Sequence, residues 1–291
     1  MNVLFAGLGS MGLGMAQSLL RADHTVQGVD PNSTRVDMLC ADGGVDDLEQ
    51  ADALVSAVLN ADQTRAVLFG PDGLADHLRP GGVILSCATV APAFAREMEA
   101  EAQARGLHYL DAPISGGAAK AAEGRLSIMA AGSADAFEAS EPLLDAMAET
   151  VHRLGDSAGA GSAMKAVNQL LAGVHIAAMG EAMAFAASQG LDPARVVDVI
   201  SVSAGTSWMF ENRAPHVVDA DYAPRSKVDI WPKDLGIVTD VASDAALPLP
   251  VTQTALSQFR ATSQAGMGDE DDAAIAKYVA RRGGVKLPGD D

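Results

Sequence analysis

The stretch "NVLFAGLGSMGLGMAQSLL", residues 2–20, decides how the first half of the chain folds. It opens as a short apolar run that ends at Gly7, which is typical of a buried strand, and it closes with the composition of a helix. Between them, Gly7-Leu8-Gly9-Ser10-Met11-Gly12 matches the pattern G-x-G-x-x-G. Gly7 would allow a tight turn, and Gly9 would let a pyrophosphate approach the backbone. Gly12 would let the helix pack closely on the strand. The stretch therefore predicts a dinucleotide-binding unit, although a turn that binds no ligand would use the same glycines.

Asp30 indicates which dinucleotide this loop binds. It ends the next predicted strand, 18 residues after Gly12. A carboxylate there can accept hydrogen bonds from both ribose hydroxyls and would repel a 2′-phosphate. No basic residue directly follows Asp30, although Arg35 is near enough in sequence to be considered for a phosphate. We therefore expect NAD rather than NADP.

Strands and helices alternate through the first half of the chain. Short buried strands alternating with helices predict a parallel sheet that is covered on both faces. The predicted strands are "NVLFAG", "HTVQGVD", "ADALVSAVL", "GGVILSCAT", "LHYLDAP", "RLSIMAAG" and "TVHRLG".

After Gly155 the strand patterns almost vanish and helical segments follow. We predict an α/β protein with two domains: a Rossmann-type NAD-binding domain over residues 1–160 and an all-helical domain for substrate binding and dimerisation over residues 161–291. The predicted helices cover about 161–189, 193–203, 207–219, 233–245, 251–264 and 272–282.

Composition excludes several classes of partner. The 291 residues carry a net charge of −18, which disfavours nucleic acid and anionic membranes but still allows a small anionic substrate. The N-terminus lacks the basic region of a secretory signal. The longest apolar stretch, 166–180, is interrupted by polar residues and is shorter than the roughly 20 residues of a membrane span. We expect a cytoplasmic protein.

Metal and hydrolase chemistry also find little support. The two cysteines and six histidines are scattered without metal-ligand spacing, so no metal site is expected. The G-x-S-x-G elbow of serine hydrolases does not occur, and Ser10 lies inside the glycine loop.

Two loops follow predicted strands at the edge where a ligand would bind. Leu59 lies at the carboxyl end of the third predicted strand, and Thr89 follows "VILSCA". In an open parallel sheet the carboxyl ends of the strands line the ligand crevice. Each residue is either a cofactor contact or part of an ordinary loop.

A second glycine cluster lies in "DAPISGGAAKAAEGRLSIMAAG", residues 111–132. Ser115, Gly116 and Gly117 supply adjacent amides and one hydroxyl, which suits a carboxylate. A structural turn before a short helix would have the same composition. Lys120 and Arg125 are expected to be solvated surface charges.

Lys165 stands in "GAGSAMKAVNQLL", residues 159–171, near the start of a helix that is apolar nearly all round. Ser162 can cap this helix, and Asn168 lies three residues beyond Lys165 on the same face. The helix dipole and partial burial would both favour a neutral amine, which could take a proton from a substrate hydroxyl. Asn168 could hold substrate hydroxyls. The alternative is a lysine that reaches solvent from the first turn.

Taken together, these segments resemble the β-hydroxyacid dehydrogenase family, which includes 3-hydroxyisobutyrate dehydrogenase and tartronate semialdehyde reductase. The resemblance covers almost the whole chain and also includes "KDLGIV" from Lys233. It implies that Gly7 to Gly12 hold the pyrophosphate, and that Thr89 contacts the nicotinamide side of NAD. One departure is Ala88, where the family commonly has a serine.

For the substrate, the resemblance implies that Ser115, Gly116 and Gly117 take the carboxylate and that Lys165 is the general acid/base. Asn168 would orient the substrate, and Lys233 would reach toward cofactor and substrate. The partner is then a small anionic hydroxy acid. The apolar helix 161–189 adds the expectation of a homodimer or homotetramer.

A narrower resemblance, in "TSWMFENRAPHVVDADYAP" and "SKVDIWPKDLG", is to the branch that oxidises L-threonate at C2. Ser207, Asn212 and Arg213 offer polar groups for such a polyhydroxy acid. The alternative is that they only cap helices or form pairs on the surface. The alternatives within the family are oxidation of 3-hydroxyisobutyrate and reduction of tartronate semialdehyde. Imine reductases share the domain plan but generally lack the lysine and prefer NADPH. A non-catalytic cofactor-binding scaffold is the remaining possibility.

Overall fold

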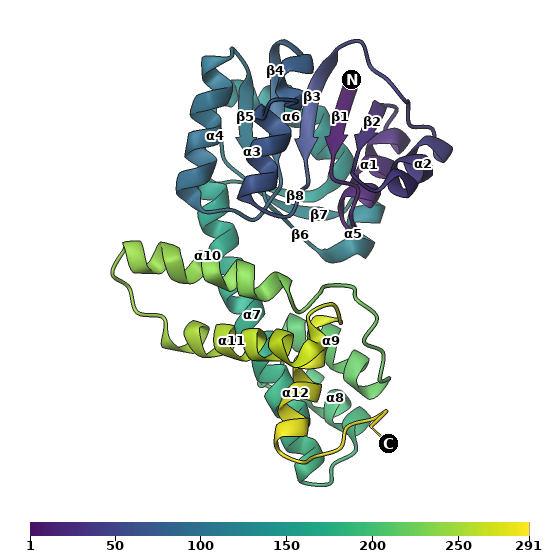
Figure 1. Ribbon diagram of the computed structural model, residues 1–291, viewed down its shortest axis with the longest axis vertical. Coiled ribbons are helices and arrows are strands. Elements are labelled where there is room, and N and C mark those ends of the chain that lie inside the picture. Colours follow the sequence, from purple (N-terminus) through teal and green to yellow (C-terminus); the bar gives the residue numbers. More distant parts are fainter. Residues whose placement is uncertain (291) are drawn as a thin grey trace. The chain divides into compact units, whose positions relative to one another are not determined.

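The computed structural model describes residues 1–290, which form two compact units (Figure 1). The first runs from Met1 to Lys165, and the second begins at Ala166. The division falls inside one long helix, α7 (Ala160–Ser188), rather than in a loop. The first turn of α7 belongs to the first unit, where Ser162 N donates to Asp111.

The first unit contains a five-stranded sheet in the order β2-β1-β3-β4-β5, and every neighbouring pair is parallel. This confirms the Rossmann-type fold. The strand order changes direction between β1 and β3, which is where such sheets bind ligands outside the carboxyl ends of their strands. The elements are β1 (Asn2–Ala6), α1 (Gly12–Arg21), β2 (Thr25–Val29), α2 (Ser33–Ala41), β3 (Ala51–Ser56), α3 (Ala61–Phe69), the short η1 (Leu74–His77), β4 (Leu78–Ser86), α4 (Pro92–Ala104) and β5 (His108–Asp111).

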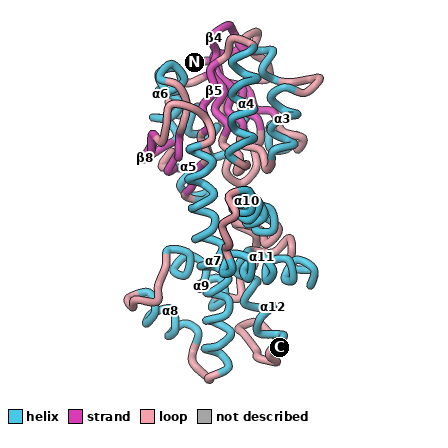
Figure 2. The backbone as a smooth tube through the Cα atoms, turned by 90° about the vertical axis from the view of Figure 1, so that its left-hand side faces the viewer, coloured by secondary structure: helices cyan, strands magenta, loops and turns pink. Residues whose placement is uncertain are grey.

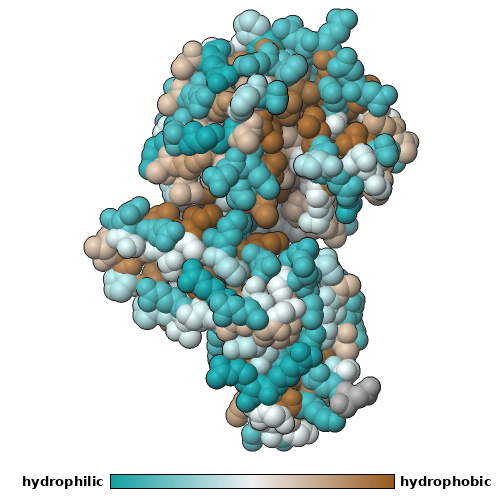
Figure 3. Space-filling view, in the orientation of Figure 1, coloured by the Kyte–Doolittle hydropathy of each residue, from teal (hydrophilic) through white to brown (hydrophobic). Residues whose placement is uncertain are grey.

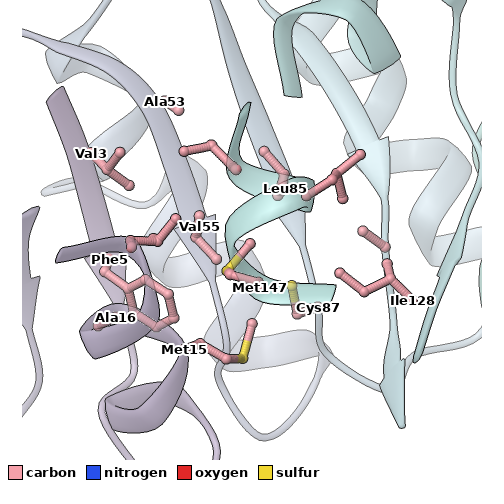
Figure 4. Close-up of a cluster of buried hydrophobic side chains, with 14 of the residues drawn as sticks. Val3, Phe5, Met15, Ala16, Ala53, Val55, Leu85, Cys87, Ile128 and Met147 are labelled. Atoms are coloured by element: carbon pink, nitrogen blue, oxygen red, sulfur yellow. The ribbon is translucent and has the colours of Figure 1, made fainter. Parts of the chain in front are cut away.

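Helices cover both faces of this sheet. Val3 and Phe5 of β1 point into one core, where Met15 and Ala16 of α1 and Met147 of α6 (Ala134–Met147) pack against them (Figure 4). Leu4 and Ala6 of β1 alternate with these residues and point to the other face of the sheet. There they belong to a second core that includes residues of α3 and α4. Figure 2 shows α3 and α4 on one side of the strands and α6 on the other. The strands are therefore apolar on both faces, which explains their continuous hydrophobic runs.

Three further strands form a separate small sheet in the order β6-β7-β8. They are β6 (Ile114–Ser115), β7 (Leu126–Ala130) and β8 (Ala148–Arg153), with α5 (Gly117–Glu123) between the first two. β6 pairs antiparallel with β7, so the expectation of one parallel sheet is wrong here. The chain reverses after β5, and the end of β7 returns to exchange backbone hydrogen bonds with Asp111. The alternation of side chains along a strand does not reveal such a reversal.

The second unit is helical, as the sequence predicts. Its core includes Ile176 and Met183 of α7, and Trp231, whose ring stacks on that of Phe259 with centroids 5.4 Å apart. After α7 the elements are α8 (Pro193–Ser201), α9 (Trp208–Val218), α10 (Ile230–Asp244), α11 (Pro250–Thr262), η2 (Ser263–Met267), η3 (Asp272–Ala274) and α12 (Ile275–Arg282).

Helix α7 is longer than the apolar stretch 166–180 suggests. Its 29 residues are long and apolar enough, by length and composition alone, to cross a membrane. Half of its most apolar window is buried within the protein, as expected for a core helix. Hydrophilic side chains cover much of the face shown in Figure 3, with apolar side chains between them.

Candidate active site

The glycine loop between β1 and α1 requires glycine at two positions for reasons internal to the protein. Gly7 has φ of +91°, and a Cβ there would lie 2.7 Å from the carbonyl oxygen of Ala57. At Gly12 a Cβ would lie 1.8 Å from the carbonyl oxygen of Gly7. Any side chain at either position would therefore distort the loop.

Gly9 differs from these two glycines, because a Cβ there would meet no atom within 4 Å. The protein's own packing therefore does not demand glycine at this position. A Cβ would instead fill the space next to the loop backbone, where a pyrophosphate is expected to lie. The start of α1 has no side-chain cap and no acidic residue in its first turn. Both features suit a phosphate, because the amides and dipole of a helix start favour negative charge.

Leu8 turns its side chain into the core, where it is fully buried. Its backbone N–H donates to Asp30 Oδ2 at 2.7 Å, and Asn32 N donates to Asp30 Oδ1 at 2.8 Å. These two bonds hold the carboxylate of Asp30 beside the glycine loop. A carboxylate has about four acceptor positions, so it can still accept from a ribose.

The loops that follow β1 to β4 share one edge of the sheet. The strand register pairs Ala6 with both Val29 and Ser56, and Ser56 with Ser86, so these strands end at one level. Leu59 lies just beyond this edge and is half exposed, with its N–H donating to Gln63. Thr89 lies beyond β4 and is partly exposed. The topology thus brings the predicted cofactor residues of the first unit to a single edge.

The second glycine cluster forms a turn between β6 and α5. Gly116 and Gly117 have φ of +139° and +80°, which disfavours side chains at both positions. Ser115, which precedes them, is paired with Ser127 of β7. Lys120 and Arg125 lie on the exposed surface nearby and pair with Glu149.

Lys165 is buried at the start of α7. Its side chain is 8 % exposed, and Nζ donates to the carbonyl oxygen of Ile114 at 2.8 Å. Ile114 directly precedes Ser115, so the amine lies beside the second glycine cluster. The side chain does not reach into solvent, in contrast to the alternative considered from the sequence.

Asp111 anchors the helix that carries Lys165, although no local sequence pattern marks this residue. Its Oδ2 accepts from Gly159 N at 2.8 Å and from Ser162 N at 2.9 Å, and its Oδ1 accepts from Ser162 Oγ at 2.7 Å. Burial raises the pKa of Asp111, although these hydrogen bonds and Arg96 oppose the rise. The expectation that Ser162 caps α7 is therefore wrong, because Ser162 lies inside the helix and a carboxylate from β5 accepts from its first turn.

Asn168 and Lys233 lie in the second unit, on α7 and α10. Gln169 and Asp234 connect them. Asn168 Nδ2 donates to Gln169 Oε1 at 2.9 Å, and Gln169 Nε2 donates to Asp234 Oδ2 at 2.5 Å. Asp234 Oδ1 lies 2.6 Å from Lys233 Nζ. Neither Gln169 nor Asp234 is singled out by the sequence, because 65 residues separate them.

The polar groups that suggested a polyhydroxy acid have other partners. Ser207 caps α9 by accepting from Phe210 N at 3.0 Å. Arg213 is buried, and its Nε donates to Asp272 Oδ1 at 2.5 Å and its Nη1 to Asn212. Ser207 therefore acts as a cap, Arg213 forms a buried ion pair with Asp272, and Asn212 accepts a hydrogen bond from Arg213.

The described residues 1–290 contain no group of three or more His, Cys, Asp or Glu side chains that could hold a metal ion. Cys87 is buried, and burial raises the pKa of its thiol to about 12.

Known protein families match nearly the whole chain. A family model for the NAD binding domain of 6-phosphogluconate dehydrogenase matches residues 2–155. A second, described as NAD-binding of NADP-dependent 3-hydroxyisobutyrate dehydrogenase, matches residues 159–279. The two models together span both units.

Individual relatives are similar over nearly their full length. The chain is 48 % identical to the L-threonate dehydrogenase of Escherichia coli O6:H1, over 99 % of this chain and 97 % of that protein. It is 47 % identical to the L-threonate dehydrogenase of Cupriavidus necator, over 99 % of this chain and 98 % of that protein. A crystal structure described as 3-hydroxyisobutyrate dehydrogenase from Salmonella typhimurium matches with a TM-score of 0.91 and 48 % identity, over 96 % of this chain and 99 % of that one. The names of these relatives differ in substrate but agree in the class of reaction.

Proposed function

Because this chain belongs to the β-hydroxyacid dehydrogenase family and is an NAD-dependent hydroxyacid dehydrogenase, we propose that it oxidises L-threonate at C2 to the 2-oxo acid, with Lys165 as the general acid/base. The first unit would bind NAD, and the helical domain over residues 161–291 would serve substrate binding and dimerisation. The names of the similar L-threonate dehydrogenases support this choice of substrate.

The observation that carries the proposal is the position of the Lys165 amine. It is buried, and it donates to the carbonyl oxygen that immediately precedes Ser115. An amine in this place can serve an acid whose carboxylate lies on the amides of Gly116 and Gly117.

Bound NAD supplies the acceptor for the hydride that leaves C2. Lys165, neutral in the reactive complex, takes the proton from the C2 hydroxyl, so the C–O bond becomes a carbonyl. In reverse, the ammonium returns that proton to the oxygen. Ser115, Gly116 and Gly117 hold the carboxylate, while Asn168 and Lys233 orient the rest of the substrate. Holding these groups in place lowers the entropic part of the barrier.

The residues around the glycine loop suit NAD. Gly9 leaves open space beside the backbone, and Gly7 to Gly12 would hold the pyrophosphate there. Asp30 would accept from the ribose hydroxyls and disfavour a 2′-phosphate. Leu59 and Thr89, at the same edge of the sheet, would contact the cofactor nearer to the nicotinamide.

Substrate profiling tests the proposed function. Purified protein with NAD is expected to form reduced cofactor with L-threonate faster than with erythronate, glycerate or 3-hydroxyisobutyrate. Activity with 3-hydroxyisobutyrate or glycerate and none with L-threonate would contradict the proposal.

Oxidation of 3-hydroxyisobutyrate or reduction of tartronate semialdehyde is the second candidate. One observation favours it: Ser207 caps a helix, Arg213 pairs with Asp272 and Asn212 accepts from Arg213, so these residues do not argue for a polyhydroxy substrate. The same assay, run with these compounds, separates the candidates.

The chain would act as a homodimer or homotetramer. Val167, Leu171 and Phe185 of α7 are at least half exposed and lie on one face of the helix, since their spacing brings them back to the same side. Large apolar side chains in such a row are expected to be covered by a second copy of the chain.

A further inference from the structure

The polar chain Asn168–Gln169–Asp234–Lys233 has a fixed direction. A carboxylate only accepts hydrogen bonds, so Gln169 must face Asp234 with its NH2 group, as it does at 2.5 Å. Its oxygen is therefore turned toward Asn168, and Asn168 meets it with Nδ2 at 2.9 Å. The charge of Asp234 thus determines the orientation of two successive carboxamides.

The same direction determines what Asn168 offers to a ligand. With Nδ2 held by Gln169, Oδ1 lies on the opposite side of the carboxamide, where it can accept a hydrogen bond from a substrate. Gln169 and Asp234 are 8 % and 2 % exposed, so water does not compete for their hydrogen bonds. The pair therefore holds Asn168 in one of its two amide orientations.

The hydroxyl that is oxidised gives its proton to Lys165 and cannot also donate it to Asn168. An acceptor on Asn168 therefore suits a different hydroxyl, next to the reacting one. We propose that Gln169 is a positioning residue that, held by Asp234, presents Asn168 Oδ1 to the hydroxyl adjacent to the carbon that is oxidised, and so selects vicinal dihydroxy acids. This inference rests on the proposed function.

Asp234 has a second part in this arrangement. Its other oxygen lies 2.6 Å from Lys233 Nζ, so one carboxylate holds both Lys233 and Gln169. Loss of its charge is expected to affect two contacts to the ligand, whereas loss of Gln169 affects only that made by Asn168. The two substitutions can therefore be told apart.

The test compares L-threonate with 2,4-dihydroxybutanoate, which lacks only the C3 hydroxyl. The wild-type protein is expected to have a kcat/KM about tenfold higher for L-threonate than for 2,4-dihydroxybutanoate. This ratio corresponds to the free energy that one additional hydrogen bond contributes. In Gln169→Met, which keeps the volume but removes both bonds, this ratio should fall to within about twofold of one. The NAD dissociation constant should stay unchanged.

Moving the carboxylate from position 234 to position 169 tests whether the substrate selectivity can be restored. In Gln169→Glu two carboxylates face each other, and we expect the selectivity to be lost. In Gln169→Glu/Asp234→Asn, the amide of Asn at 234 can donate to Glu at 169, whose other oxygen still accepts from Asn168 Nδ2. The double variant should regain most of the selectivity, while the KM stays raised because Lys233 has lost its carboxylate.

Gln258→Met is the matched control, because Gln258 also donates to a carboxylate in the second unit, that of Glu181. It should leave the selectivity ratio unchanged. A Gln169→Met variant that has a lower Tm but the wild-type ratio would overturn the proposal, since Gln169 would then be only structural. Equal wild-type activity with both acids would overturn it as well.

Failure of the proposed function has a different signature. If the wild-type protein oxidises neither four-carbon acid, L-threonate is not the substrate, and the same ratio is then measured with glycerate against 2-hydroxypropanoate. A wild-type preference for glycerate that Gln169→Met abolishes would support the role of Gln169, and any other result would overturn it.

Discussion

Glycines three residues apart in the loop after β1 meet different physical requirements. Gly12 has no room for a Cβ because the carbonyl oxygen of Gly7 would lie 1.8 Å away, whereas a Cβ at Gly9 meets no protein atom within 4 Å. The fold itself thus requires glycine at position 12. Glycine at position 9 is required only by the pyrophosphate that the loop is proposed to bind.

Alanine at these two positions should therefore separate stability from cofactor binding. Gly12→Ala is expected to cost about 1–3 kcal/mol of stability through overpacking. Gly9→Ala should change stability by less than about 0.5 kcal/mol and still weaken NAD binding strongly. Thermal unfolding and NAD titration measure the two effects. Unchanged NAD affinity in Gly9→Ala would show that no pyrophosphate lies against this loop.

Asp30 is the residue at which the choice of cofactor can be tested. Asp30→Ala removes the acceptor for the ribose hydroxyls and the charge that would repel a 2′-phosphate. The KM for NAD should rise about tenfold, and activity with NADP should improve relative to NAD. Steady-state kinetics with both cofactors measure the ratio, and an unchanged preference would contradict the role given to Asp30.

At the scale of elements, the start of α7 depends on Asp111. Three donors from Gly159 and Ser162 converge on this carboxylate, and Lys165 follows in the same helix. Asp111→Asn replaces one acceptor by an NH2 group and leaves a buried donor unpaired. We expect a loss of about 1–3 kcal/mol and a lower kcat, because the Lys165 amine is displaced. Asp240→Asn, at an exposed position on α10, is the control, and an unchanged kcat in Asp111→Asn would contradict the anchoring role.

The loop between α9 and α10 is held by Asp271, which makes its stability depend on pH. Burial raises the pKa of Asp271, but hydrogen bonds from His216 and from the backbone of Arg225 and Ala273 outweigh it, so the pKa is lowered. A carboxyl with a lowered pKa in the folded state stabilises that state above its unfolded pKa, and this contribution is lost as the pH falls through the folded value.

Asp271→Asn should therefore destabilise the protein by about 1–3 kcal/mol at neutral pH, and the difference from the wild type should shrink below about pH 4. Unfolding at a series of pH values, with the exposed Asp269→Asn as the control, measures this. A difference that stays constant down to pH 2 would show that charge on Asp271 does not stabilise the loop.

At the scale of the whole molecule, the proposed association can be tested on α7. Replacing Val167 and Leu171 by glutamate places charge on the exposed apolar face of this helix. The variant should elute as a monomer at the concentration at which the wild-type protein is a dimer or tetramer, as light scattering would show. If the wild-type protein is a monomer, there is no such interface. If the variant keeps the wild-type oligomeric state, the interface lies elsewhere on the surface.

How much of this molecule the sequence predicts depends on the range of the interactions. The loop from Gly7 to Gly12, the parallel sheet and the positions of the helices follow from local patterns. The pairing of Asp111 with the start of α7, and of Gln169 with Asp234, joins residues far apart in sequence, and no local pattern reveals it. Arg213 shows the reverse case, because a polar residue that suits a ligand is used to pair a buried carboxylate.

The central claim is that the buried amine of Lys165 exchanges a proton with the substrate, and the turnover of Lys165→Met tests it most directly. With saturating NAD and the best hydroxy acid of the wild type, kcat should fall on the order of 10³-fold, while the NAD dissociation constant stays unchanged. A variant that keeps its NAD affinity and turns over at nearly the wild-type rate would contradict the account.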